Sequence, residues 1–146
     1  MALLSMGGCS MLGFFQSKPQ YAYVANWSAV SAYRINATTG TLTPVPGSPF
    51  AAGILPSSVM VNPAGTFAYV ANSDSSNISA YSINASTGTL TPVPGSPFAS
   101  GPYPASVTVN PTGTFAYVAT GLPGGVGSIW VYRIDASSGA LTPVAG

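Results

Sequence analysis

The sequence predicts an all-β fold in which about three four-stranded antiparallel sheets stack face to face. Three features predict it: a long internal repeat, short β-rich runs separated by turns containing glycine and proline, and strands that are apolar on both faces. No stretch shows helical periodicity. The 146 residues are enough for one domain with a substantial core.

The repeat is visible in the residues themselves. The run Tyr21–Asn26 recurs as Phe67–Asn72 and again as Phe115–Thr120. A longer stretch, Thr39–Gly53, matches Thr87–Gly101 at all positions but one. The repeat length falls in the range of roughly 40–50 residues that is typical of repeat architectures built from small sheets.

Each repeat unit is expected to form four short strands. In the middle unit the predicted strands are Ser57–Asn62, Phe67–Asn72, Asn77–Asn84 and Leu90–Val93. The stretch Pro94–Pro104 then crosses to the next unit, and glycine-containing turns separate the strands.

The third strand indicates how the sheets are arranged. Tyr81 and Ile83 would lie on one face of it, and Ile78 and Ala80 on the other. A sheet with one wet face would alternate apolar with polar residues, so each sheet is expected to lie between two neighbours. This is the packing of blades in a β-propeller.

The predicted organisation leaves a propeller that needs partner chains or further blades to close. The sequence divides into an apolar segment (1–19, with a degenerate first strand at Met11–Gln16), blade repeat 1 (20–66), blade repeat 2 (67–114) and blade repeat 3 (115–146, truncated in its outer strand). Closed propellers have about four to eight blades. We therefore expect apolar faces open at both ends of the stack, and a homo-oligomer, either a head-to-tail dimer that closes a six-bladed ring or a filament.

Three motifs resemble a known family. The Tyr-Val-Ala-Asn strand, the Asn-Pro-x-Gly turn and the Thr-Gly-x-Leu-Thr-Pro-Val run are similar to those of bacterial YVTN-type and lactonase-family (6-phosphogluconolactonase-like) propellers, over Gln20–Val144. The resemblance implies seven blades in a complete member, and a histidine, an acidic residue and arginines in a lactonase site. Because this chain has no histidine and no glutamate, no catalytic residue can be carried over.

Charge is scarce, which narrows the function classes. Charged residues make up 3% of the chain and the net charge is +1, so nothing indicates a nucleic-acid or anionic-membrane surface. Without histidine, and with a single cysteine, we expect no metal site and no cofactor. Arg34 and Arg133 are expected near strand ends as solvated side chains, and Asp135 as a turn cap.

The loop between the second and third strands varies in length and is expected at the same end of each blade as the crossovers. It contains Asp74 in the middle unit, and Gly121, Gly124 and Gly125 in the last. These residues form a candidate ligand-end loop, although such loops also vary without selection.

The N-terminal stretch suggests a location. Met1–Phe15 is apolar, too short to span a bilayer as a helix, and similar to the end of a bacterial lipoprotein signal with Cys9 as the lipidated residue. On this interpretation the protein is extracellular, periplasmic or on the cell surface. The alternative is an apolar first strand.

Three functions fit the sequence. We expect a non-catalytic propeller module, exported, with a structural or binding role through self-association. The alternatives are a divergent or truncated lactonase-like enzyme and a fragment of a larger bacterial surface propeller.

Overall fold

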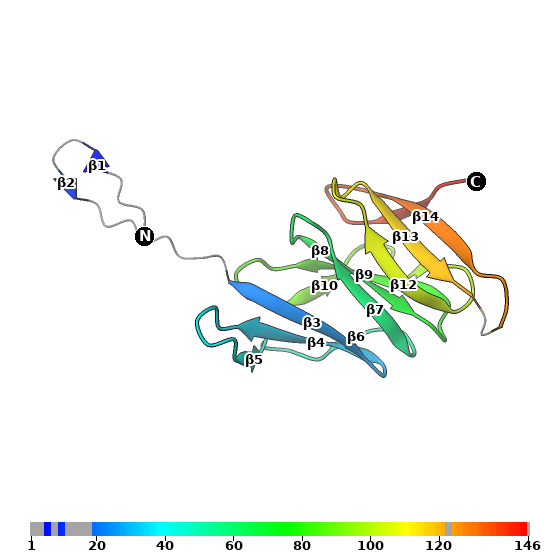
Figure 1. Cartoon of the computed structure of the whole chain (residues 1–146), viewed down its shortest axis with the longest axis horizontal. Helices are drawn as coiled ribbons and strands as arrows, with labels where there is room; N and C mark the ends of the chain where they lie inside the picture. Colours follow the sequence, from blue (N-terminus) through cyan, green and yellow to red (C-terminus); the bar gives the residue numbers. More distant parts are fainter. Residues whose placement is uncertain (1–4, 7–8, 11–18, 122–123, 146) are drawn as a thin grey trace.

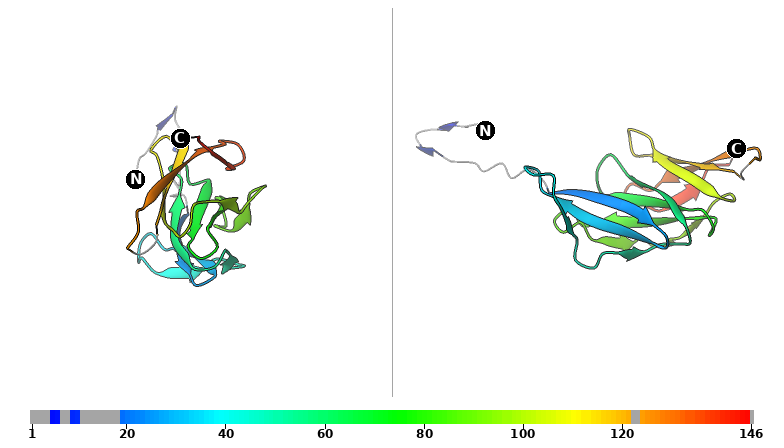
Figure 2. Two further views of the ribbon diagram at one scale, coloured as in Figure 1. Left: turned by 90° about the vertical axis from the view of Figure 1, so that its right-hand side faces the viewer. Right: turned by 60° about the horizontal axis from the view of Figure 1, so that its bottom comes forward.

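The structure is a computed structural model that describes residues 5–6, 9–10, 19–121 and 124–145. These residues form strands and turns without a helix, which confirms the all-β prediction. Three antiparallel sheets follow one another along the chain and stack side by side without closing a ring (Figure 1). Figure 2 shows the same stack from two further directions. The chain is thus a partial propeller, and we call the sheets blades A, B and C.

Blades A and B share one strand order, except that blade A has no described counterpart of the first strand of blade B. Blade A consists of β3 (Gln20–Asn26), β4 (Ala29–Ile35), β5 (Leu42–Pro44) and β6 (Phe50–Ala51). Blade B consists of β7 (Pro56–Val61), β8 (Phe67–Asn72), β9 (Asn77–Ile83), β10 (Leu90–Pro92) and β11 (Phe98–Ala99). In both blades the third strand of the repeat pairs with two short strands at its outer edge, one after the other.

Blade C has the same order without a described counterpart of β6 or β11. It consists of β12 (Pro104–Val109), β13 (Phe115–Thr120), β14 (Ser128–Ile134) and β15 (Leu141–Pro143). At the other end of the chain, β1 (Ser5–Met6) and β2 (Cys9–Ser10) form a separate two-stranded ladder. The expected degenerate strand at Met11–Gln16 lies outside the described residues.

The boundaries of the sequence repeats do not coincide with the boundaries of the sheets. Each sequence repeat begins at the second strand of a sheet, since β7 pairs with β8 and β12 pairs with β13. Blades B and C therefore each take their first strand from the end of the preceding repeat.

The short strands β6 and β11 were not predicted, because the stretches that contain them were interpreted as plain crossovers. Each is held by a serine that fills the gap between the two outer strands. The Ala80 amide donates to Ser96 Oγ at 2.9 Å, and the Ala32 amide donates to Ser48 Oγ at the same distance. The first part of each crossover is thus bound to the third strand.

The Asn-Pro-x-Gly motif forms the turn between the first two strands of a blade. Asn62 Oδ1 accepts hydrogen bonds from the amides of Thr66 (2.8 Å) and Phe67 (2.9 Å). Asn110 makes the same pair of bonds in blade C. The motif has a structural role, because the side-chain oxygen of the asparagine accepts from two backbone amides that have no backbone acceptor within the turn.

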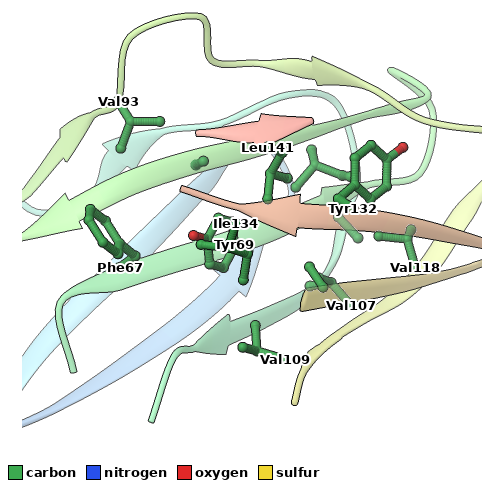
Figure 3. Close-up of a cluster of buried hydrophobic side chains, with 13 residues drawn as sticks. Phe67, Tyr69, Val93, Val107, Val109, Val118, Tyr132, Ile134 and Leu141 are labelled. Atoms are coloured by element: carbon green, nitrogen blue, oxygen red, sulfur yellow. The ribbon is translucent and has the colours of Figure 1, made fainter. Parts of the chain in front are cut away.

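The core lies between the blades, as the third strand predicted. Every residue of β8 is buried. Figure 3 shows Phe67, Tyr69 and Val93 of blade B against a set of side chains from blade C, namely Val107, Val109, Val118, Tyr132, Ile134 and Leu141. A second cluster joins blade A to the opposite face of blade B through Val30, Ala68, Val70, Tyr81 and Leu90.

Candidate interaction faces

The two interfaces between blades share a tyrosine-to-glycine hydrogen bond. The Tyr23 hydroxyl of blade A donates to the Gly88 carbonyl of blade B at 2.9 Å. One blade further, the Tyr69 hydroxyl donates to the Gly139 carbonyl of blade C at 3.0 Å. Each tyrosine comes from the second strand, and each glycine from the turn after the third strand of the next blade.

An aromatic ring covers the same glycine at both interfaces. A Cβ atom on Gly88 would lie 2.3 Å from Cδ1 of Tyr21, and one on Gly139 would lie 2.4 Å from Cδ1 of Phe67. Both glycines have positive φ, +76° and +74°, in the turn that their sequence motif specifies. Only glycine fits these positions, because the turn needs a left-handed residue and the ring leaves no room for a side chain.

A second hydrogen bond runs back across each interface. The Tyr81 hydroxyl donates to the Ala51 carbonyl of blade A at 2.5 Å, and the Tyr132 hydroxyl donates to the Ala99 carbonyl of blade B at 2.8 Å. These acceptors belong to β6 and β11, so the short strands also carry contacts between blades.

Blade C presents an open face that repeats the buried face of blade B. We call it the trailing face and define it by Phe115, Tyr117, Ala119, Ile129 and Val144. In blade B the five equivalent residues are all buried, namely Phe67, Tyr69, Ala71, Ile78 and Val93. On the trailing face Tyr117 is 37% exposed, Ile129 72% and Val144 44%.

Blade A presents the complementary face. We call it the leading face and define it by Val24, Tyr33, Gly40 and Leu42. The blade C residues at these positions, which pack on blade B, are the buried Val118, Tyr132, Gly139 and Leu141. On the leading face Val24 is 47% exposed and Leu42 53%, and nothing lies within 4 Å of a Cβ atom built on Gly40. Among the described residues, the expectation of apolar faces at both ends of the stack is confirmed.

Burial raises the pKa values of the interface tyrosines. Burial, and to a smaller extent the neighbouring Tyr21, raises the pKa of Tyr23 to about 12. Burial also raises the pKa values of Tyr69, Tyr81 and Tyr132. Because a tyrosine can donate a hydrogen bond only when it is protonated, these bonds persist throughout the neutral range. Tyr69 is a core residue, whereas the equivalent Tyr117 is exposed.

The candidate ligand-end loops lie beside the crossovers, as predicted. The amide of the exposed Asp74 donates to the Ile54 carbonyl of the A–B crossover at 3.2 Å. The Gly121 amide donates to the Tyr103 carbonyl of the B–C crossover at 3.3 Å. Gly124, with φ +78°, and Gly125 are exposed. Asp74 thus belongs to a loop of blade B, and the glycines belong to a loop of blade C.

The crossovers carry backbone strain and exposed apolar side chains. Leu55 and Tyr103 both have φ +50°, which non-glycine residues rarely adopt. Trp27 (80% exposed) and Ile54 (60% exposed) lie at the same end of blade A. This end offers apolar contact area, and Asp74 is the charged residue that the described loops and crossovers place there.

The remaining charged residues serve the turns and strand ends. Asp135 Oδ1 accepts hydrogen bonds from Ser137 and Ser138, so its predicted role as a turn cap is confirmed. Arg34 and Arg133 pair with Tyr21 and Phe115 at the blade end opposite the crossovers. Arg34 lines a groove of about 360 Å³ along the A–B interface, next to Ser86.

Cys9 lies in β2, opposite Met6. Within the part of the chain that the structure describes, no three His, Cys, Asp or Glu residues gather as metal ligands would. That part also lacks any helix with the length and apolar character needed to cross a membrane.

Sequence patterns missed the docking role of the glycine turns. The sequence indicated only that glycine-containing turns separate the strands, although Gly88 and Gly139 each receive a ring and a hydroxyl from the preceding blade. The available signal was a pair of aromatic residues in each second strand, a Tyr or Phe followed two positions later by a Tyr. This pair recurs in every repeat that also contains the glycine turn, which could have indicated a contact between the two.

A family model described as a seven-bladed β-propeller lactonase matches residues 15–103. Among solved structures, the chain is similar to a candidate 6-phosphogluconolactonase from Bacteroides fragilis, with 21% identity over 85% of this chain and 34% of that one and a TM-score of 0.71. It is also similar to the periplasmic gluconolactonase PpgL of Pseudomonas aeruginosa, with 18% identity over 86% and 37% and a TM-score of 0.66.

A functionally unknown protein from Desulfotomaculum acetoxidans shares 24% identity over 81% of this chain and 34% of that one, with a TM-score of 0.69. At these identities the structural likeness concerns the fold. The chain spans about a third of the length of these structures. No curated protein matches it in sequence.

Proposed function

The chain belongs to the lactonase family of seven-bladed β-propellers, and from this premise we propose that it acts as a non-catalytic array of blades that associates with further copies of itself. Its role is structural, or it supplies a binding surface that exists only in the assembly. Two copies supply six blades, a number within the range of about four to eight at which propellers close.

One observation carries this proposal. The trailing face repeats five residues of a face that is buried inside the same molecule, with Val131 in place of Ala80 beside them. Burying a side chain such as Ile129 contributes about 1.5–3 kcal/mol, so exposure of this whole face favours association.

Chemistry at the crossover end supports a non-catalytic role. Hydrolysis of a lactone needs a general base, and stabilisation of the oxyanion needs positioned donors or cations. The loops and crossovers that are described contain Asp74 as their charged side chain, and both arginines lie at the other end of the blades.

Light scattering coupled to size exclusion tests self-association. A single chain has a mass of 14.6 kDa. We expect twice that mass, or a series of larger multiples, at micromolar concentration. A stable species of 14.6 kDa at every micromolar concentration would contradict the proposal.

A lactonase is the second candidate, and the names of two similar structures favour it. Hydrolysis of 6-phosphogluconolactone, followed as proton release, separates the two candidates. We expect the spontaneous rate with and without the protein. Hydrolysis that scales with protein concentration and falls in Asp74→Asn would replace the non-catalytic proposal, and Ser75→Ala in the same loop is the control.

We also propose that the protein acts outside the cytoplasm. The pattern of small residues before Cys9 supports lipidation, and one similar structure is named a periplasmic protein. Bacterial cells fed with labelled palmitate should label the wild type and not Cys9→Ser. Equal labelling of both, or label in neither, would contradict lipidation.

A further inference from the structure

The two interfaces inside the chain define what an open face needs as a partner. At the A–B and B–C interfaces, the second strand of one blade places an aromatic ring over a glycine of the next blade and donates a tyrosine hydroxyl to the carbonyl of that glycine. The contact therefore has a direction: one blade supplies the ring and hydroxyl, and the next supplies the glycine turn.

The trailing face offers the donor half of this contact. Phe115 and Tyr117 occupy the positions of Phe67 and Tyr69 on a strand with the same pairing register. Arg133 lies 5.3 Å from the centre of the Phe115 ring. It does not block docking, because its counterpart Arg34 lies in the groove beside the closed A–B interface.

The leading face offers the acceptor half, already formed. Gly40 has φ +72°, and its amide donates to the Asn36 carbonyl at 2.8 Å, as Gly88 and Gly139 do in their turns. Asn36 Oδ1 accepts from the Thr38 and Thr39 amides, which holds the turn in shape. The space over Gly40 that a ring fills at the other two glycines is empty of described atoms.

We infer that the trailing face of one copy docks on the leading face of a second copy, with the Phe115 ring over Gly40 and the Tyr117 hydroxyl donating to the Gly40 carbonyl. This inference rests on the proposed self-association and adds its direction. The contact is heterologous, because a trailing face carries no exposed glycine turn and a leading face carries no exposed ring pair of this kind among the described residues. Tyr33 is the counterpart of Tyr81 and Tyr132, whose hydroxyls donate back to β6 and β11 of the preceding blade. The proposed contact does not include such a bond from Tyr33, because blade C has no described counterpart of β6 or β11.

Two variants that each block one face test the direction. Gly40→Asn fills the space over the leading turn, and asparagine tolerates the positive φ better than other side chains. Its matched control is Gly65→Asn, because Gly65 has φ +70° and an equally empty surrounding. Ala119→Arg places a charge on the trailing face, and Ala64→Arg, in an exposed turn of blade B, is its control.

Sedimentation velocity at micromolar concentration provides the readout. We expect Gly40→Asn and Ala119→Arg to be monomeric alone, and both controls to associate like the wild type. Mixed in equal amounts, the two blocked variants should form a one-to-one dimer, because one supplies a free trailing face and the other a free leading face. The mixture should have a dissociation constant at least tenfold below that of either variant alone.

The outcomes separate this inference from the proposed function. If either blocked variant still associates by itself, or if the mixture stays monomeric while the wild type associates, self-association stands and its head-to-tail direction is wrong. If the wild type itself is monomeric throughout, both the proposed function and the inference fail.

Discussion

Tyr69 and Tyr117 occupy the same position in neighbouring blades, yet Tyr69 is fully buried and Tyr117 is 37% exposed. The same contrast holds for Ile78, with no exposed surface, and Ile129, which is 72% exposed. The second and third strands of the two blades have the same lengths, pairing and register. Blade B differs in having β11, whose Phe98 pairs with Ile78, and blade C has no described counterpart of that strand. For Tyr69 and Tyr117, whose strands match, the difference in burial comes from the neighbouring blade: blade C covers Tyr69, and no described residues cover Tyr117 in the same way.

The comparison predicts its largest effect for truncation of the two isoleucines. Ile78→Ala should lower the free energy of unfolding by about 2–5 kcal/mol, because it leaves a cavity between blades B and C. Ile129→Ala should change the stability of the monomer by less than about 0.5 kcal/mol, because the side chain is largely in water.

Both changes in the free energy of unfolding can be measured by urea unfolding at a protein concentration low enough to keep the chain monomeric. Equal losses for Ile78→Ala and Ile129→Ala would show that the trailing face is covered within a single chain.

Glycine substitutions test the ring-over-glycine contact. Gly139→Ala should destabilise the monomer by about 1–3 kcal/mol more than Gly40→Ala. Both variants force alanine into a left-handed conformation, but only at Gly139 does the new Cβ meet the ring of Phe67. The difference between the two unfolding midpoints is the measurement, and no difference would mean that the Phe67 ring moves aside freely.

Removing one hydroxyl gives a smaller effect. Tyr69→Phe should cost about 0.5–1.5 kcal/mol, because it removes one hydrogen bond between blades B and C. Tyr117→Phe should leave monomer stability unchanged, and thermal unfolding of the two variants side by side shows whether this asymmetry exists. A comparable loss of stability in Tyr117→Phe would contradict the expected difference between the buried and the exposed tyrosine.

The sequence predicted the blade interior well and the blade contacts poorly. Residues such as Ile78 and Ala80 alternate with equally apolar neighbours, and this pattern alone required a sheet covered on both sides. By contrast, β11 is two residues long within a run of proline, glycine and serine, and it exists because Ser96 bridges the gap beside it. Periodicity cannot reveal so short a strand.

The candidate site shows the same limit. The motif around Gly88 predicts a turn, but not that Tyr21 and Tyr23 of another blade dock on it, because that contact depends on how blades are placed in space. The exposure of Tyr117 likewise depends on which neighbour is present and cannot be derived from a repeat that is the same in each blade.

The smallest predicted effect is that of pH. Hydrogen bonds from the side chain of Ser137 and from Ser138 hold the pKa of Asp135 at about 2, below its ordinary 3.8. Its contribution to stability is therefore complete above about pH 4 and is lost as the pH falls toward 2. The pKa of Tyr23 is raised from 10.0 to about 12, so its contribution is lost only as the pH rises from 10 toward 12.

Between these limits the chain has no histidine to titrate. The urea midpoint should accordingly be flat from about pH 5 to about pH 9. A midpoint that moves sharply in that range would show that a group outside these two contributes to the contacts between blades.

The concentration dependence of unfolding tests the central claim, that the open faces of blades A and C bury each other in an assembly. For a dimer, a hundredfold rise in protein concentration should raise the apparent free energy of unfolding of the wild type by about 2.7 kcal/mol per mole of dimer, and should leave Gly40→Asn unaffected. An unfolding midpoint of the wild type that is the same at both concentrations would contradict the account.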